Sequence, residues 1–280
     1  MSVQTSTFRG QPVVRFSLPG GDSCMVALHG AHVLSWVTAD GVERLYLSPD
    51  ARFDGQSAIR GGVPICWPQF NMRGSLPKHG FVRNVAWQAE SVEVNGRQAT
   101  ATLALHDDTA LRAIWPHSFR ARLAVTLAPH ALKIALSIAN IGSGPWSFAA
   151  ALHSYLRVDD VTEAALEGLQ GANRWDAVRD DRHVEVAQAL RFGSEFDSVY
   201  ASPAGPLRLV QPSGTLEISQ SASCTETVVW NPGPVLAAKL DDLPDDGWRH
   251  MLCVEAARID ESVLLAPGAQ WQGWQQLTVS

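Results

Sequence analysis

The strongest constraint on the fold is a two-residue alternation of apolar and polar side chains, repeated in short segments along the chain. It is clearest in FRARLAVTLA, residues 119–128, and in ALKIALSIAN, residues 131–140. Successive side chains of a strand point to opposite faces of a sheet, so each segment predicts a strand with one buried face. Pro129 and His130 mark a turn between them, and the whole predicts a β-hairpin.

Comparable segments recur elsewhere, separated by turns drawn from 22 glycines and 16 prolines. This pattern favours an all-β fold, a large antiparallel sandwich or barrel. One short helix is expected at Asp108–Trp115, because Asp108 can cap its first turn and Pro116 ends it. The other expected strands are Val13–Leu18, Cys24–His29, His32–Val37, Ala99–Leu105, Trp146–Leu156, Leu207–Val210, Leu216–Ser219, Thr227–Trp230, Leu252–Arg258 and Trp271–Val279.

No linker, internal repeat or low-complexity tract marks a domain boundary. All-β sandwiches reach about 250 residues as one domain, so residues 1–280 are expected to form a single domain. The chain carries 22 Lys and Arg against 28 Asp and Glu, a net charge of −6. That balance offers no broad basic surface to nucleic acid or to an anionic membrane, and we expect neither partner. We expect a monomer.

The cysteines lie apart, without C-x-x-C spacing, which favours free buried thiols in a reducing compartment. The opening MSVQTSTFRG lacks the apolar core of a secretory signal, and no stretch approaches the ~18 apolar residues needed to cross a bilayer. We therefore expect a cytoplasmic protein. The cysteines are Cys24, Cys66, Cys224 and Cys253.

The most unusual local composition lies between Gly55 and Ala89, a window with a charge of +4 and no Asp or Glu. Its glycines and prolines make it largely loop, the usual carrier of binding residues. Arginine and lysine suit phosphate, so the window indicates a site for a small anion, most simply a phosphate ester. A solvated basic face is the alternative. The basic residues of the window are Arg60, Arg73, Lys78 and Arg83.

Three further residues have acid–base potential. His79 lies in KHGFVR and His153 closes the apolar segment WSFAAALHSYL. Histidine suits proton transfer at neutral pH, although a structural role is the alternative. Glu255 stands in MLCVEAARI, and a carboxylate enters so apolar a strand only with a partner or a raised pKa. A functional carboxylate and an ion pair with Arg258 or an arginine of the window both stay open.

Other chemistries find no support. The chain has no GxSxG, Walker, GxGxxG or HExxH motif, and its histidines lack the spacing of a metal site. Several acidic pairs stand beside turn signals and are expected to be surface turns or caps. They are Asp107–Asp108, Asp159–Asp160, Asp180–Asp181, Asp241–Asp242 and Asp245–Asp246.

Six ordered motifs resemble those of the glucose-6-phosphate 1-epimerases, the hexose-6-phosphate mutarotases of the galactose mutarotase-like superfamily. They are RGGVPICWPQF, KHGFVRNVAW, ALHSYLRV, FDSVY, VVWNPG and DDGWRHMLCVEA. The resemblance spans the chain from roughly Arg60 to the last strand. It implies a large antiparallel β-sandwich with a sugar site on a concave face. It also implies interconversion of the α and β anomers of an aldohexose 6-phosphate, without metal or organic cofactor.

By this resemblance, Glu255 is the general base on the C1 hydroxyl and His153 the acid that protonates the ring oxygen. The ring opens to the aldehyde, rotates about C1–C2 and closes on the other face. The basic window is expected to recognise the phosphate. Substrate-binding roles fall, by the same resemblance, on Arg60, Lys78, His79, Arg83, Asp197 and Gln69.

Two tryptophans, Trp67 and Trp230, are candidates for apolar walls of the sugar site, with core packing as the alternative. The sequence departs from the family at Gly233, Ser198 and Asn71, where a bulky aromatic, a basic residue and a glycine are expected. These departures bear on the sugar preference and the pocket rim. Two other functions stay open: an aldose 1-epimerase for unphosphorylated sugars, and a non-catalytic sugar-phosphate-binding protein on the same scaffold.

Overall fold

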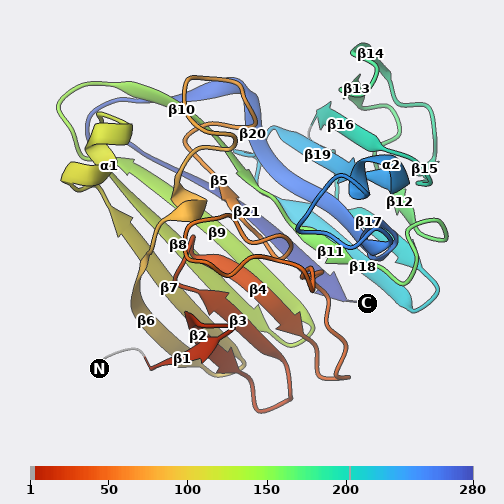
Figure 1. The fold of residues 1–280 in the computed structure, drawn as a ribbon, viewed down its shortest axis with the longest axis horizontal. Coiled ribbons are helices and arrows are strands. Elements are labelled where there is room, and N and C mark those ends of the chain that lie inside the picture. The colour runs from red at the N-terminus through yellow and green to blue at the C-terminus, as the bar shows by residue number, and fades with distance from the viewer. Residues whose placement is uncertain (1–3, 202, 280) are drawn as a thin grey trace.

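The computed structural model describes residues 4–201 and 203–279 and shows a chain built mainly of antiparallel strands (Figure 1). The strands form three sheets, of four, eight and nine strands. The all-β, antiparallel prediction is confirmed. Among the described residues, no helix is long and apolar enough to span a membrane.

The nine-stranded sheet contains the predicted hairpin. Its strands are β6 (Gln88–Asn95), β7 (Gln98–His106), β8 (Phe119–Ala128), β9 (Ala131–Asn140), β12 (Ala165–Glu167), β15 (Ala189–Leu190), β17 (Leu207–Gln211), β18 (Gly214–Gln220) and β21 (Gln270–Val279). They follow the order β15-β12-β17-β18-β21-β9-β8-β7-β6. Side chains along β8 and β9 alternate between buried and partly exposed, and Leu123 pairs with Leu136 across the hairpin. The two-residue alternation therefore correctly predicted both strands and which face of each is buried.

The eight-stranded sheet carries the polar clusters discussed below. Its strands are β5 (Ile65–Cys66), β10 (Trp146–Leu152), β11 (Tyr155–Arg157), β13 (Asn173–Asp176), β14 (Asp181–Val184), β16 (Phe196–Ala201), β19 (Glu226–Asn231) and β20 (Met251–Leu265). Seven follow the order β14-β13-β16-β19-β20-β10-β5, and β11 pairs with β20. The four-stranded sheet consists of β1 (Thr5–Phe8), β2 (Gln11–Ser17), β3 (Ser23–Ala27) and β4 (His32–Val37), in that order.

Helices are few and short. The predicted helix is confirmed as α1 (Thr109–Ile114), where the Asp108 side chain accepts a hydrogen bond from the Leu111 N–H at 2.8 Å. The second helix, α2 (Gly233–Ala237), and the 3₁₀ turns Val82–Asn84 and Gly247–His250 were not predicted. Five residues or fewer give too little periodicity to recognise.

Aromatic side chains fill the core between the two larger sheets. Trp67 is fully buried and packs edge-on against its neighbours, at ring-centroid distances of 4.9 Å to Trp115 and 4.8 Å to Phe119. The suggestion that Trp67 forms a wall of the sugar site is therefore wrong, because its indole packs inside the hydrophobic core. All four cysteines are free and buried, as predicted.

Candidate active site

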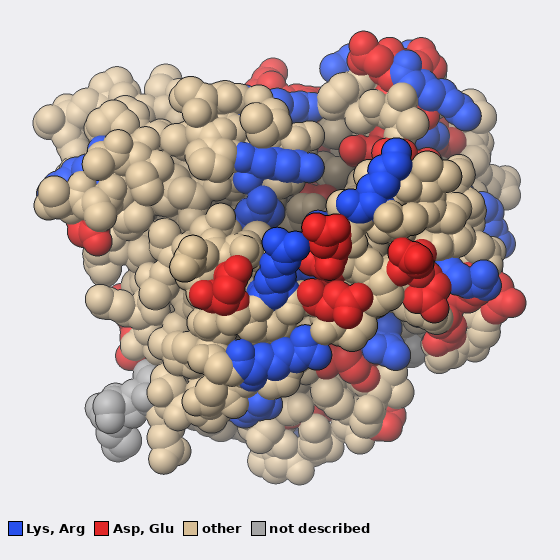
Figure 2. All heavy atoms as spheres, in the orientation of Figure 1, with Lys and Arg blue, Asp and Glu red and all other residues tan. Residues whose placement is uncertain are grey.

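A cavity of about 530 Å³ opens beside the eight-stranded sheet, within the size range of ordinary ligand pockets. On the face shown in Figure 2, basic and acidic side chains gather around a central hollow. Every predicted site residue except Gln69 lines the cavity. Those lining residues are Arg60, Lys78, His79, Arg83, His153, Asp197 and Glu255.

A break between two strands places the histidine at the cavity. The predicted strand Trp146–Leu156 divides into β10 and β11, and the His153 N–H leaves the ladder to bond the Pro64 carbonyl at 3.0 Å. Strand β20 continues past the break, pairing Ala256 with Leu152 and Cys253 with Tyr155. Glu255 therefore lies on β20 beside the break that presents His153.

His153 and Glu255 form a buried pair. The His153 Nε2 lies 3.4 Å from Glu255 Oε1, and the two side chains are 10% and 1% exposed. Neither Glu255 Oε2 nor His153 Nδ1 has a hydrogen-bond partner among the described residues. No arginine pairs with Glu255 there, because Arg258 bonds Thr225 and Glu261 instead. The ion-pair alternative for Glu255 is therefore wrong.

Arg60, Lys78 and Arg83 all line the cavity, and we call these three residues the cationic wall. The Arg83 Nη2 donates to the Lys78 carbonyl at 2.9 Å, and its Nε has no partner in the described chain. The fourth cation of the basic window, Arg73, lies elsewhere: it bonds Asp260 at 2.9 Å. Three of the window's four charges thus converge on the cavity, while the fourth is structural.

The cavity environment disfavours charge on the His153–Glu255 pair. Burial raises the pKa of the Glu255 carboxyl well above its ordinary value, Asp197 adds to the rise, and Arg83 and Lys78 oppose it. Burial also lowers the pKa of the His153 imidazole, and its cationic neighbours lower it further. Both shifts therefore favour the uncharged forms, with the titratable proton on the carboxyl rather than on the imidazole.

His79 is presented by a tight turn of the loop before it. Its backbone has a φ of 66°, in the left-handed region, and its Nδ1 accepts the Asn71 N–H at 3.2 Å. Burial and the nearby cations lower the pKa of His79 to about 3. Neutral His79 therefore carries its proton on Nε2, which makes that atom a hydrogen-bond donor.

Gln69 does not line the cavity; it organises the loop that carries His79 and Lys78. Its side chain is buried, its Nε2 donates to the Asn71 carbonyl at 2.9 Å and the Leu76 carbonyl at 3.0 Å, and its Oε1 accepts the Leu76 N–H. The side-chain amide of Gln69 thus holds the backbone of this loop at several points. Direct substrate contact by Gln69 stays a prediction, whereas a positioning role is visible in these bonds.

The three family departures have different structural consequences. Asn71 lines the cavity. The Ser198 hydroxyl instead accepts a hydrogen bond from the Arg174 Nε at 3.1 Å, on the face of β16 opposite Asp197. Gly233 has a φ of 60°, and a Cβ there would lie 2.3 Å from the Glu195 backbone nitrogen. Glycine lets the Glu195 segment approach, and Glu195 then joins the cavity rim.

Several lining residues escaped sequence reasoning. Tyr155 lies two residues after His153, a spacing that places both on one face of an extended chain. Asp242 was expected in a surface turn, but its Oδ1 lies 3.0 Å from the Arg60 Nη2. Asp242 does lie in a turn, as expected, but its side chain pairs with Arg60 and lines the cavity. Only the spacing of Tyr155 gave a signal, because the Asp242 contact joins residues 182 positions apart in the sequence.

The fold and this cavity define a β-sandwich protein with a buried histidine–glutamate pair in a polar cavity of ligand size. The chain belongs to the Aldose 1-epimerase family, whose model matches residues 12–278. No group of three or more His, Cys, Asp or Glu side chains in the described ranges gathers as a metal site.

Individual relatives agree with the family. A protein of Cenchrus ciliaris with the provisional name glucose-6-phosphate 1-epimerase is 35% identical over 269 residues, 91% of this chain and 82% of its own. A protein of the same provisional name from Escherichia coli K12 is 33% identical over 240 residues, 84% and 80% of the two chains. The structure of a candidate mutarotase from Salmonella typhimurium superimposes with a TM-score of 0.90 at 28% identity, covering 99% of this chain and 92% of that one.

Proposed function

We propose that this epimerase interconverts the α and β anomers of an aldohexose 6-phosphate, with D-glucose 6-phosphate as its substrate. One observation carries the proposal: a His153–Glu255 pair, 3.4 Å apart, lies in a cavity whose cationic wall suits a phosphate. The provisional names of the relatives point to the same substrate. Arginine forks and a lysine ammonium are the side chains that proteins use to bind phosphate groups.

The pair fits the two oxygens of a hemiacetal. Both oxygens are bonded to C1, so the groups that serve them must lie close together, as His153 and Glu255 do. Glu255 as carboxylate takes the proton of the C1 hydroxyl, the C1–ring-oxygen bond breaks, and His153 gives its proton to the released oxygen. The aldehyde rotates about C1–C2, and closure reverses both transfers.

The proton inventory of the pair matches this cycle. The pKa shifts favour Glu255 as the holder of the titratable proton in the unliganded site, whereas the reaction starts with that proton on His153. A shift of one proton within the pair converts one form to the other, with no proton gained from water. We assign His79, as an Nε2 donor, and Asp197, as an acceptor, to sugar hydroxyls, because both line the cavity.

The remaining expectations follow from this assignment. We infer one domain over residues 1–280, since one hydrophobic cluster contains residues from Val14 to Leu277. We also infer a cytoplasmic monomer that binds neither nucleic acid nor membranes. The proposed chemistry uses side chains alone and requires no metal or organic cofactor.

The test is a side-by-side assay of anomer exchange by NMR or polarimetry. Fresh α-glucose 6-phosphate should equilibrate much faster with the protein than with the Glu255→Gln variant. Equal rates for the two proteins would refute the assignment. A preference for free glucose or galactose that survives replacement of Lys78 and Arg83 by alanine would instead favour an epimerase of unphosphorylated sugars. Binding without turnover would favour a non-catalytic protein.

A further inference from the structure

Tyr155 touches both halves of the site. Its ring stacks on the His153 imidazole, with centroids 4.8 Å apart and planes only 8° from parallel. Its hydroxyl accepts a hydrogen bond from the Arg60 Nη1 at 3.0 Å. Tyr155 is 3% exposed, and its backbone is fixed by bonds to Gly62 and Tyr46. One rigid side chain therefore connects the proposed acid with the cationic wall.

Besides its contact with Glu255, the His153 ring is oriented mainly by aromatic neighbours. The other aromatic rings near His153 meet it edge-on: His79 at 5.6 Å and 70°, and Trp230 at 6.1 Å and 81°. Its Nδ1 has no hydrogen-bond partner among the described residues, so no second-nitrogen contact fixes the ring. Of these three rings, only Tyr155 stacks face to face on the imidazole, and a change in the tilt of that face changes where Nε2 points.

The Arg60 guanidinium is held in place, but not all of its N–H donors are used. Its Nε and Nη2 share the Asp242 Oδ1, at 3.1 and 3.0 Å, and its Nη1 bonds Tyr155. A guanidinium has five N–H donors, so these contacts leave about two for a ligand. An anion that takes them adds further contacts to a guanidinium that Asp242 already holds at the cavity edge.

We propose that Tyr155 is a positioning residue that couples anion binding at Arg60 to the placement of His153, so that an occupied anion subsite raises turnover at C1. The inference rests on the proposed function and extends it. The phosphate then contributes to the chemical step as well as to binding. When a sugar without a phosphate binds, the position of the acid, His153, is less well fixed.

The experiment separates the anion from the sugar. Enzyme-dependent mutarotation of free α-glucose is measured with and without sulfate, an anion too weakly basic to catalyse the exchange appreciably itself. The native protein should turn over faster with sulfate, and the Tyr155→Phe variant, which keeps the stack but lacks the Arg60 bond, should lose most of that gain. Tyr46→Phe is the matched control, because Tyr46 is buried outside the cavity. It should keep the full gain.

Glucose 6-phosphate gives a second readout. Tyr155→Phe should lower kcat/KM for this substrate about tenfold, the size of one hydrogen bond to a charged group. Part of the loss should appear in kcat, since His153 is less well placed. A loss confined to KM, or an equal sulfate gain in native and Tyr155→Phe proteins, would overturn the coupling.

A turnover-free measurement keeps the coupling distinguishable from the function. Sulfate should shift the ¹⁵N ring signals of His153 in the native protein and shift them much less in Tyr155→Phe, with both proteins folded by circular dichroism. Identical shifts would overturn the coupling even if the epimerase activity holds. Absent exchange of glucose 6-phosphate would overturn the function, while the sulfate titration would still report on the coupling.

Discussion

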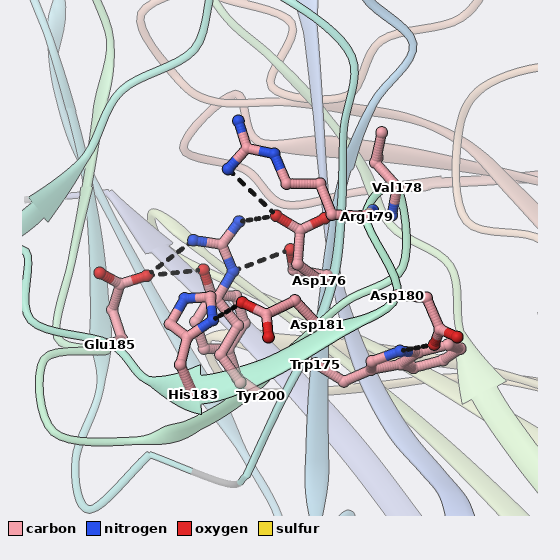
Figure 3. Close-up of polar contacts among 11 residues, drawn as sticks. Trp175, Asp176, Val178, Arg179, Asp180, Asp181, His183, Glu185 and Tyr200 are labelled. Atoms are coloured by element: carbon pink, nitrogen blue, oxygen red, sulfur yellow. Dashed lines mark hydrogen bonds and ion pairs between the residues drawn. The ribbon is translucent and has the colours of Figure 1, made fainter.

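Two buried polar clusters on the eight-stranded sheet have opposite characters. The first, the Arg174 cluster, consists of Arg174, Asp176, Glu185, Ser198 and Tyr200. Figure 3 shows the carboxylates of Asp176 and Glu185 converging on one guanidinium, at 3.2 and 3.1 Å. The Tyr200 hydroxyl donates to Glu185, and backbone N–H groups satisfy the remaining carboxylate oxygens. Each charge has an opposite charge or a donor.

The second cluster, the His153–Glu255 pair, is as deeply buried and much less satisfied. Each of its residues retains a polar atom without a partner in the described chain. Uncompensated burial costs free energy, so the pair persists because the surrounding sheet holds it in place. The difference teaches how to interpret buried charge: a closed network stabilises the fold, whereas unmet hydrogen-bonding capacity inside a cavity marks atoms reserved for a ligand.

Breaking the pair should cost rate. We expect Glu255→Gln to lower kcat about 10³-fold, some 4 kcal/mol in activation free energy, because the amide cannot accept the hydroxyl proton. Its thermal unfolding midpoint at neutral pH should equal or exceed that of the native protein. Steady-state exchange kinetics and calorimetry provide the two readouts. A less stable variant with near-native kcat would reverse the comparison.

Breaking the Arg174 cluster should cost stability instead. Arg174→Met leaves Asp176 and Glu185 buried without their shared cation, so the free energy of unfolding should fall by about 3 kcal/mol. Urea titration measures this change. Activity per folded molecule should fall far less than in Glu255→Gln. An unfolding free energy within experimental error of the native value would show that the cluster's hydrogen bonds contribute nothing net.

The pH dependence of stability should separate the clusters further. The raised pKa of Glu255 means that the folded protein retains a proton that the unfolded chain releases near the ordinary carboxyl pKa. This contribution is complete below that ordinary pKa and is lost as pH rises towards the folded value. Unfolding midpoints from pH 5 to 9 should therefore fall less steeply in Glu255→Gln than in the native protein. Parallel curves would contradict the assignment.

The pH profile of kcat/KM should be a bell whose limbs belong to the pair. Activity needs one proton on the pair, so it is lost at low pH when His153 and Glu255 are both protonated, and at high pH when neither is. The lowered His153 and raised Glu255 pKa values set these limbs far apart. Arg83 lowers both pKa values, so Arg83→Gln should move both limbs to higher pH. If neither limb moves in Arg83→Gln, Arg83 does not lower the two pKa values.

The smallest effect should come from an exposed ion pair used as a reference. Arg208 and Glu167 lie 2.8 Å apart with side chains 56% and 38% exposed. Arg208→Ala should lower the unfolding free energy by under about 1 kcal/mol, because solvent screens the pair. A loss comparable to that of Arg174→Met would mean that burial does not account for the contrast.

The sequence predicted some features of these regions and not others. Local periodicity gave the β8–β9 hairpin, since its contacts join neighbours in the chain. Glu255 was detectable because a carboxylate in an apolar strand violates the pattern around it. The Arg174 cluster was not detected, because most of its contacts join residues 11 to 24 positions apart that only the folded sheet brings together. The Asp242–Arg60 contact was missed for a different reason: only the folded chain brings those residues together.

The uninterrupted path of β20 past the β10–β11 break makes the site sensitive to chain length. Strand register decides which face each side chain occupies, and a single inserted residue exchanges the two faces. An insertion between Met251 and Glu255 would turn the carboxylate away from His153 with its chemistry intact. The loops around the rim can vary in length and alter which sugars fit. Within β20 the number of residues before Glu255 therefore matters for activity. A substitution keeps the register of the strand, whereas an insertion or deletion does not.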